Sequence, residues 1–391
     1  MKPLENLVIL DLSRVLACPF ASMVLAELGA RVIKVEQPGS GDETRGFEPQ
    51  LAQDSAYYFA CNRSKESITV NLRSDEGKKI IRELAVKADV LVENFPVGTL
   101  GRYALDFASL SALNDKLIYV SCTGFGQTGP YAEKKGYDTV FQAMGGLMSL
   151  TGEKGGGPVK PGLPVADLTS GLWVAIAILA ALAGRARTGK GCQVDFSMLD
   201  GQVALLTLAA ARFFALNEVP PRLGTEHPGR VPSATFRCKD GKYAHITASD
   251  QHWAPLCKAL GLGDWGLSFN GNAIRVEKRD EVMRQLTKAV EKLNRSELLS
   301  LLDEVDVPVG PVNDVAEILR DPHVRARRLV GSFDYPGVGE FKALALPYKF
   351  LGWDPPEIGR PPTLGEHTET ILASLNYSKE EIEKLREKRA I

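Results

Sequence analysis

The chain has few cysteines for its 391 residues, and none of them form a recognisable metal or disulfide pattern. No two stand at CxxC spacing, and no histidine lies at ligand distance from them along the sequence. Cysteines placed this way indicate reduced, buried thiols in a cytoplasmic protein rather than a disulfide framework or a zinc site. We therefore expect no metal. The six positions are Cys18, Cys61, Cys122, Cys192, Cys238 and Cys257.

An excess of charge is also missing. The 47 basic and 48 acidic residues give 47 − 48 = −1, so no overall field attracts nucleic acid or an anionic membrane. The longest apolar run, Leu172 to Ala183, is shorter than the roughly 20 residues that span a bilayer. The first residues lack the apolar core of a signal peptide. We expect a soluble protein that binds neither nucleic acid nor membrane, and any polyanionic ligand must be met by individual Arg and Lys residues.

Several common catalytic motifs do not occur: GxSxG, the P-loop and HExxH are all absent. The five histidines are not clustered, and only His227, in a loop flanked by glycine, is a candidate for a mobile lid. Gly124 to Gly129 matches GxGxxG, but Pro130 and a charged run follow it where a dinucleotide fingerprint needs a helix. We expect these glycines to allow tight turns and a close approach of the backbone to a ligand.

What the sequence does contain is an alternation of strands and helices in its first half. Short apolar strands of this kind are typical of a parallel sheet buried on both faces. Helices are expected over 20–28 and 74–87, with Ser74 as the cap of the second. The pattern predicts a doubly wound, parallel, Rossmann-like α/β sheet. The expected strands are 7–12, 30–36, 67–72, 90–93, 117–122 and 193–198, the last followed by a helix through Asn217.

Composition changes near Val219, where a Pro- and Gly-rich segment begins. A hairpin about Asp240-Gly241 and three amphipathic helices (252–260, 280–293 and 296–306) follow it. We expect residues 1–218 plus 330–391 to form the large domain, and 219–329 to form a linker and a smaller α+β domain. Near the end of the chain, Ser378 to Glu381 is typical of a capping box.

Asp167 stands just ahead of a long apolar run that opens at Leu168. Asp is a preferred N-cap residue, so its carboxylate could accept a hydrogen bond from the N–H of Thr169 or Ser170. A carboxylate at such a position could instead be the nucleophile of covalent acyl chemistry. The local sequence leaves both interpretations open.

Three segments, together with RPPTLGEHT near the end, resemble the class III CoA-transferases, the family that includes formyl-CoA transferase and carnitine CoA-transferase. They are ILDLSRVLACPFA with GARVIKVEQPGSGDETRG, then DVLVENFPVG, and then KKGYD with PVADLTSG. Alpha-methylacyl-CoA racemase is a divergent branch of the family. The resemblance covers nearly the whole chain and implies an interlocked homodimer.

The resemblance also implies roles for particular residues. Asp167 would be the nucleophile and Tyr137 would position the acyl group, with CoA, bound as acyl-CoA, and a carboxylic acid as the substrates. The contacts to CoA would come from Leu16, Ala17, Gln37, Val70, Asn71, Leu72, Arg73, Asn94, Phe95, Pro96, Arg102, Lys135, Gly136, Asp138 and Met198.

The chain departs from the formyl-CoA enzymes at two of these positions. They have Gln where Leu16 stands, which argues against oxalate as the acceptor. They have Arg where Gln37 stands, and Lys34 or Arg45 could bind the ribose or phosphate in place of that arginine. The GTEHPG segment resembles the branch that handles dicarboxylates and succinyl-CoA.

Transfer of CoA between small, perhaps dicarboxylic, acids through an aspartyl-CoA thioester on Asp167 is therefore the expected activity. The alternative within the family is an α-methylacyl-CoA racemase, which needs two acid/base groups. That branch has His where Tyr137 stands, and a Tyr with a pKa near 10 is a poor base at neutral pH. The alternative of another class is a non-catalytic CoA-binding protein, which would use Arg102 and Lys135 but not Asp167.

Overall fold

The computed structural model describes residues 2–391. The chain forms two compact units. The first comprises the chain up to Leu147, Pro161–Ala211 and His323–Ile391, and the second comprises Met148–Lys160 and Arg212–Pro322. The division expected from the sequence, with boundaries at 219 and 329, stays a prediction about domains.

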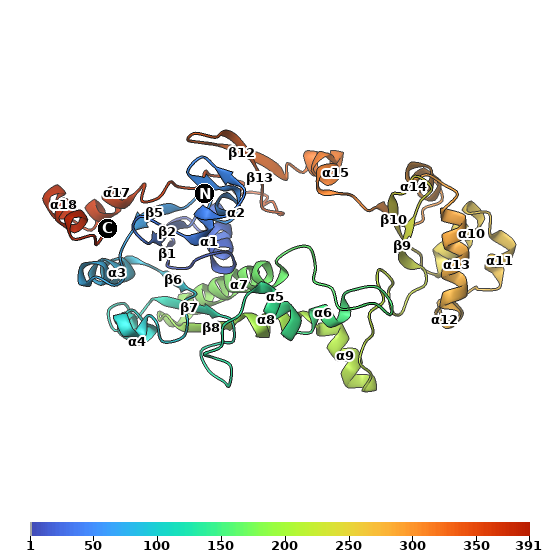
Figure 1. The fold of residues 1–391 in the computed structure, drawn as a ribbon, viewed down its shortest axis with the longest axis horizontal. Coiled ribbons are helices and arrows are strands. Elements are labelled where there is room, and N and C mark those ends of the chain that lie inside the picture. Colours follow the sequence, from blue (N-terminus) through green and yellow to red (C-terminus); the bar gives the residue numbers. More distant parts are fainter. Residues whose placement is uncertain (1) are drawn as a thin grey trace. The chain divides into compact units, whose positions relative to one another are not determined.

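A six-stranded sheet organises the first unit (Figure 1). Every neighbouring pair in it is parallel, which confirms the expected α/β class. The spatial order β5-β2-β1-β6-β7-β8 reverses between β1 and β6, and open α/β sheets bind ligands at such a switch point, beyond the carboxyl ends of the strands. The strands are β1 (Val8–Asp11), β2 (Arg31–Glu36), β5 (Glu66–Thr69), β6 (Val90–Glu93), β7 (Ile118–Thr123) and β8 (Gln193–Ser197).

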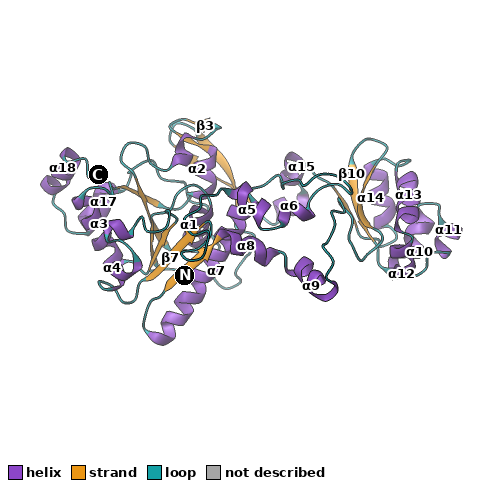
Figure 2. Ribbon diagram, turned by 60° about the horizontal axis from the view of Figure 1, so that its bottom comes forward, coloured by secondary structure: helices purple, strands orange, loops and turns teal. Residues whose placement is uncertain are grey.

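Each face of the sheet carries its own hydrophobic core, because successive strand residues point to opposite faces. In β1, Leu10 belongs to the core under α3 (Asp75–Lys87), α4 (Phe107–Ser111), α17 (Thr368–Ser374) and α18 (Lys379–Glu387). Its neighbour Ile9 belongs to the core under α1 (Ala17–Glu27), α5 (Asp138–Met144) and α7 (Val165–Thr188). Figure 2 shows these helices around the strands.

Helix α7 is longer than the apolar run that predicted it. It begins at Val165, before Leu168, and ends where Gly189 adopts the left-handed conformation at φ 70°, a common helix stop. Gly171 lets it approach α1, because a Cβ there would come within 2.5 Å of the Ala17 carbonyl oxygen. Among residues 2–391 it is the one unbroken helix long and apolar enough to cross a bilayer. It packs on α1, while its residues Leu172, Trp173 and Ile176 are exposed.

The segment after β8 differs from the expected single helix. Helix α8 (Met198–Leu205) and helix α9 (Thr207–Leu216) meet at a bend of 64°. The hydroxyl of Thr207 donates to the carbonyl oxygen of Ala204, and such a side-chain bond to the backbone competes with the regular helix ladder.

The second unit contains an antiparallel sheet in the order β11-β10-β9. The predicted hairpin is confirmed: β9 (Ser233–Arg237) pairs with β10 (Tyr243–Thr247) across a turn in which Gly241 has φ 77°. Trp253 and other buried apolar residues join the sheet to its helices. The remaining elements are β11 (Val309–Pro311), α10 (Asp250–Ala259), α11 (Gly263–Leu267), α12 (Asn272–Glu277), α13 (Arg279–Val290) and α14 (Arg295–Asp303).

The last part of the first unit bonds to the edge strand β5, where the hydroxyl of Thr368 accepts from the N–H of Thr69 at 3.1 Å. The hairpin β12 (Val330–Tyr335) and β13 (Gly339–Leu344) packs its aromatic residues on Phe59 of α2 (Ala56–Cys61). The capping box at Ser378 is confirmed, since its hydroxyl accepts from the N–H of Glu381. Short elements complete the chain: β3 (Gln50–Leu51), β4 (Asp54–Ser55), α6 (Leu147–Leu150), α15 (Val315–Arg320), α16 (Pro322–Ala326), and the 3-10 turns Glu43–Gly46 and Gly101–Tyr103.

Candidate active site

The loop that follows β1 lies at the switch point of the sheet, and Asn94, just after β6, clamps it. The Asn94 Oδ1 accepts from the N–H of Arg14 at 2.9 Å, and its Nδ2 donates to the Arg14 carbonyl at 2.8 Å. The Arg14 guanidinium lies over the ring of Phe95, 5.2 Å from the centroid. The structure therefore brings together two segments that the resemblance assigned to CoA, around Leu16 and around Asn94.

This loop is held in an unusual conformation. Val15 has φ 70°, which a β-branched residue rarely adopts and which costs energy. Its N–H faces both carboxylate oxygens of Asp42 at 3.3 Å, and Lys34 Nζ donates to the carbonyl of Ser13 at 3.0 Å. These polar contacts over-determine the loop and direct Leu16 and Ala17 to the start of α1, where both are buried.

The expectation that Lys34 or Arg45 binds CoA in place of an arginine at position 37 is wrong. Lys34 is fully buried and pairs with Asp42 at 2.8 Å. Burial alone would lower the pKa of Lys34, but the carboxylates of Asp42 and Asp11 raise it above its usual value. Arg45 is also buried and pairs with Glu36 at 2.7 Å. Both cations are used in internal ion pairs, because a buried charge needs a partner.

The segment after β5 has a mixed character. Val70 is buried in the core, and the side-chain Nδ2 of Asn71 donates to the carbonyl of Arg389 near the end of the chain. Arg73 is exposed just before α3, and Arg102 is exposed in the turn Gly101–Tyr103. Lys78 of α3 lies over the ring of Tyr103 at 5.8 Å, so the turn that carries Arg102 packs against the same helix that Arg73 precedes.

Asp167 lies in the first turn of α7 but does not cap it, so the N-cap interpretation is wrong. The cap position is Pro164, which offers no side-chain acceptor. Asp138, the first residue of α5, serves instead: its Oδ1 accepts from the N–H of Ala166 at 2.8 Å and of Asp167 at 3.3 Å. N–H groups at the start of the helix are thus satisfied from another helix, and the carboxylate of Asp167 is not used as the cap.

The electrostatic environment of Asp167 is unusual for an aspartate. Burial, and then the neighbouring charge of Asp138, raise the pKa of Asp167 to about 7. Tyr57 of α2 shares this environment, since burial and then the charge of Asp167 raise the pKa of Tyr57 to about 12. A strongly shifted carboxyl group next to a second one is typical of functional sites.

Lys135, Gly136 and Tyr137 lead directly into α5 and so stand beside Asp138. Phe141 fixes them, because a Cβ on Gly136 would come within 2.5 Å of its ring and one on Gly124 within 2.6 Å. Lys135 is exposed, and the side chain of Tyr137 is 82% exposed. The GxGxxG segment does not open a helix, as expected, since α5 begins only at Asp138.

The other predicted residues lie along the same edge of the sheet. Gln37 is exposed immediately after β2, and Pro96 is exposed after β6. Leu72 packs partly buried against the core. Met198 begins α8 and is buried in the core on the α7 side of the sheet.

Sequence reasoning missed three residues of this region: Arg14, Tyr57 and Gln142. Arg14 stands inside a motif that the sequence already singled out. Gln142 follows Asp138 by four residues, which places both on one face of α5. Nothing in the sequence marks Tyr57, which approaches Asp167 only through the tertiary fold.

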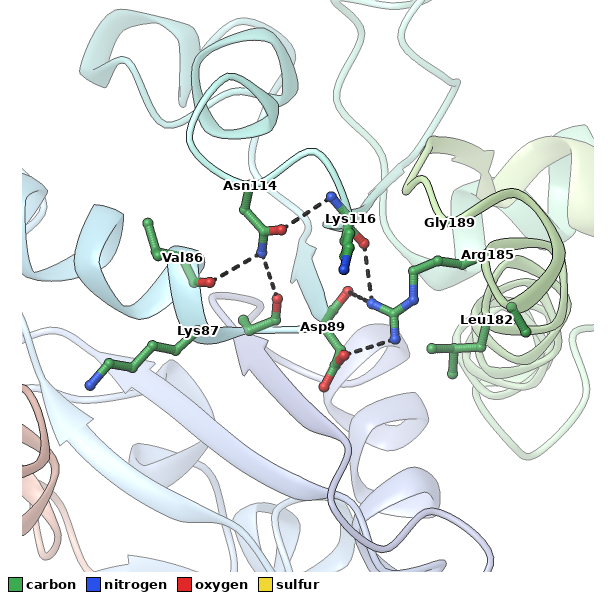
Figure 3. Close-up of a pocket in the computed structure, with 10 residues that line it drawn as sticks. Val86, Lys87, Asp89, Asn114, Lys116, Leu182, Arg185 and Gly189 are labelled. Atoms are coloured by element: carbon green, nitrogen blue, oxygen red, sulfur yellow. Dashed lines mark hydrogen bonds and ion pairs between the residues drawn. The ribbon is translucent and has the colours of Figure 1, made fainter.

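A hollow of about 440 Å³ lies elsewhere, beside Asp89 and Lys116, which precede β6 and β7 (Figure 3). Arg185, near the end of α7, pairs there with Asp89 at 2.8 Å. At 1.5 Å per helical residue, Arg185 is about 27 Å from Asp167 along α7. This hollow is at the amino edge of the sheet, opposite the edge where such folds bind ligands. Among residues 2–391 no three His, Cys, Asp or Glu side chains converge as a metal site.

The fold and the site together define an α/β protein with a carboxyl group of raised pKa at the carboxyl edge of a Rossmann-like sheet. The chain belongs to CoA-transferase family III, whose family model matches residues 4–368. It is an enzyme of the CoA-transferase class.

The relatives cover almost the whole chain. Succinyl-CoA:glutarate CoA-transferase of Homo sapiens is 40% identical over 375 residues, which are 95% of this chain and 86% of that protein. Acetyl-CoA:oxalate CoA-transferase of Acetobacter aceti is 37% identical over 90% of each chain. The crystal structure of a CAIB/BAIF family protein from Brucella suis matches with a TM-score of 0.87 and 40% identity, over 96% of this chain and 99% of that one.

Proposed function

We propose that this CoA-transferase moves CoA between small dicarboxylic acids, with Asp167 as the covalent nucleophile. One observation carries the proposal. The carboxyl group of Asp167 lies in the first turn of α7 but does not cap the helix, because Asp138 accepts from the N–H groups there. The names of the relatives support dicarboxylic substrates, since they act with glutarate and with oxalate.

The reaction needs four acyl transfers. The carboxylate of Asp167 attacks the thioester carbonyl, which forms a mixed anhydride and expels CoA thiolate. The thiolate attacks the aspartyl carbonyl, which forms the aspartyl-CoA thioester and releases the first acid. The second acid attacks this thioester and expels the thiolate again, and the thiolate then attacks the carbonyl of the new acyl group and regenerates Asp167. No step consumes a proton.

The pKa of Asp167 fits this role. A nucleophile with a pKa near 7 is substantially ionised at neutral pH and is more basic than an ordinary aspartate. Tyr137, exposed next to Asp138, would position the acyl group by a hydrogen bond.

CoA carries several phosphate charges, and a protein with a net charge of −1 must meet them locally. Arg73, exposed just before α3, and Arg102, exposed in the turn Gly101–Tyr103, are the cations we assign to this role. Lys135 and the loop clamped by Asn94 would contact the rest of the cofactor. Charge-assisted bonds from guanidinium to phosphate are strong and directional.

We also propose that the protein is a cytoplasmic homodimer with interlocked chains. Large apolar side chains of α7 and α8 are exposed, among them Leu172, Trp173, Ile176 and Val203. An apolar surface of this kind typically marks an interface. A monomer in sedimentation velocity at micromolar concentration would contradict the dimer.

The test of the mechanism is chemical trapping. Hydroxylamine added during turnover should convert the activated Asp167 to a hydroxamate, which mass spectrometry detects on its peptide. Asp167→Ala should abolish transfer while CoA still binds. An unmodified peptide under every donor, or substantial activity of the variant, would refute the covalent route. A panel of carboxylic acids with succinyl-CoA and acetyl-CoA would identify the substrates.

A further inference from the structure

Two completely buried glutamines form hydrogen bonds next to the helical turn that carries Asp167. On the α5 side, Gln142 Nε2 donates to Asp138 Oδ2 at 2.6 Å, while Asp138 Oδ1 accepts from the start of α7. On the α8 side, Gln202 Nε2 donates to the hydroxyl of Thr169 at 3.1 Å. Gln142 therefore acts on the first turn of α7 through Asp138, with a longer bond of its own to the carbonyl of Leu163 at 3.5 Å, whereas Gln202 bonds to a side chain of α7 itself.

The orientation of the Gln142 amide is determined by chemistry. An ionised carboxylate only accepts hydrogen bonds, so the NH₂ group must face Asp138 and the Oε1 must point away. That Oε1 is buried with no protein partner among residues 2–391. A buried polar atom left without a partner is costly and needs an explanation. An apolar side chain would avoid this cost, so the hydrogen bonds of the NH₂ group, to Asp138 at 2.6 Å and at longer range to the Leu163 carbonyl, are the reason for a glutamine here.

We propose that Gln142 is a positioning residue for the reacting carboxylate of Asp167, acting through Asp138. The inference rests on the proposed function of Asp167 and adds the means by which its orientation is held. The bond from Gln142 keeps one oxygen of Asp138 occupied, so that the other remains directed at the N–H groups of Ala166 and Asp167. The turn bearing the nucleophile is thereby fixed relative to α5, which begins next to Tyr137.

The same pair controls the charge beside the nucleophile. The titratable groups that interact with Asp167 are Asp138 of α5 and Tyr57 of α2. Of the other elements packed on α7, α8 contributes the exposed Asp200, and α1 contributes Cys18 and, at its far end, Glu27. Strand β7 contributes Tyr119 and Cys122 but no carboxylate and no cation. A change in the ionisation or position of Asp138 should therefore alter the titration of Asp167.

The first experiment compares Gln142→Leu with Gln202→Leu, a matched variant of an equally buried glutamine that does not contact Asp138. Because small misplacements of a reacting group can cost about 10²-fold in rate, Gln142→Leu should lower kcat by roughly that factor with little change in KM. The acid limb of its kcat/KM profile should move to lower pH, because a displaced or protonated Asp138 no longer repels the charge on Asp167. In Gln202→Leu the acid limb should stay in place.

A second variant keeps the shape and tests the hydrogen bond itself. In Gln142→Glu a protonated side chain can still donate to Asp138, whereas an ionised one repels it. The activity of Gln142→Glu relative to wild type at the same pH should therefore be nearly full at low pH and fall as pH rises, which a purely structural role would not produce. A wild-type pH profile in Gln142→Glu, or an acid limb that is unmoved in Gln142→Leu or shifted equally in both leucine variants, would overturn the positioning role.

Hydroxylamine trapping separates this failure from failure of the mechanism. A wild-type enzyme that yields no hydroxamate on Asp167 would refute the proposed function and, with it, the role of Gln142. A trapped wild-type enzyme whose variants show the contrary pH profiles would refute the role of Gln142 alone.

Discussion

Asp167→Asn should make the folded protein more stable at alkaline pH while it abolishes CoA transfer. The pKa of Asp167 rises on folding from its usual 3.8 to about 7, through burial and the charge of Asp138. A group whose pKa is higher in the folded state favours folding when protonated, and this contribution is lost as pH rises from about 4 through about 7. The amide cannot ionise, so the variant avoids the cost of the buried charge.

The magnitude follows from the shift. At about 1.4 kcal/mol per pKa unit, roughly three units correspond to at most about 4 kcal/mol. Asp167 is only partly buried, so solvent screening reduces the expected gain to about 1–2 kcal/mol between pH 5 and pH 8. Urea denaturation of wild type and Asp167→Asn at pH 5 and at pH 8 measures this gain in the free energy of unfolding.

The control is Asp75→Asn, in the first turn of α3. Hydrogen bonding and charge from Lys78 lower the pKa of Asp75, so its replacement should bring no gain in stability as pH rises. If the stability difference between Asp167→Asn and wild type is the same at pH 5 and pH 8, the carboxyl group is not destabilised by burial and the reasoning fails.

Three further variants test other parts of the structure. Gly136→Ala places a Cβ 2.5 Å from the buried Phe141 ring. This overpacking should lower the free energy of unfolding by about 1–3 kcal/mol and lower kcat, which urea denaturation and steady-state kinetics measure. An unaffected enzyme would show that Phe141 does not fix this loop. Arg102→Ala should raise KM for acyl-CoA far more than it lowers kcat, and the opposite pattern in steady-state kinetics would exclude a phosphate anchor. Arg45→Met leaves Glu36 and Asp54 buried without their cation and should cost about 3–5 kcal/mol, so a urea midpoint close to wild type would contradict the buried network.

The sequence predicted the sheet well because its strands are short apolar runs that are buried on both faces. Such runs between turns are typical of strands in a parallel sheet. The limits of β6 agree residue for residue, and Ser74 caps α3 as expected. The bend between α8 and α9 was not predictable, since apolar residues continue through it and only a hydroxyl-to-backbone bond marks it.

Within the candidate site, local sequence could not decide the role of Asp167. An aspartate before an apolar run has the composition of a cap, and the true acceptor, Asp138, lies 29 residues away on another helix. The suggestion that Lys34 or Arg45 binds a phosphate failed for a similar reason, because a cation's partners are set by the packing of strands and loops around it. The interactions of Tyr57 with Asp167 and of Gln142 with Asp138 likewise become visible only in the tertiary structure.

The sequence alone determined the class of fold, through the spacing of apolar residues, and the membership of the family, through motifs that keep their order along the chain. The tertiary structure decided which carboxylates and cations are free and which are bound to one another. The physical reason is that periodicity and propensity act between near neighbours, whereas burial and charge depend on every group that the fold brings within a few ångströms.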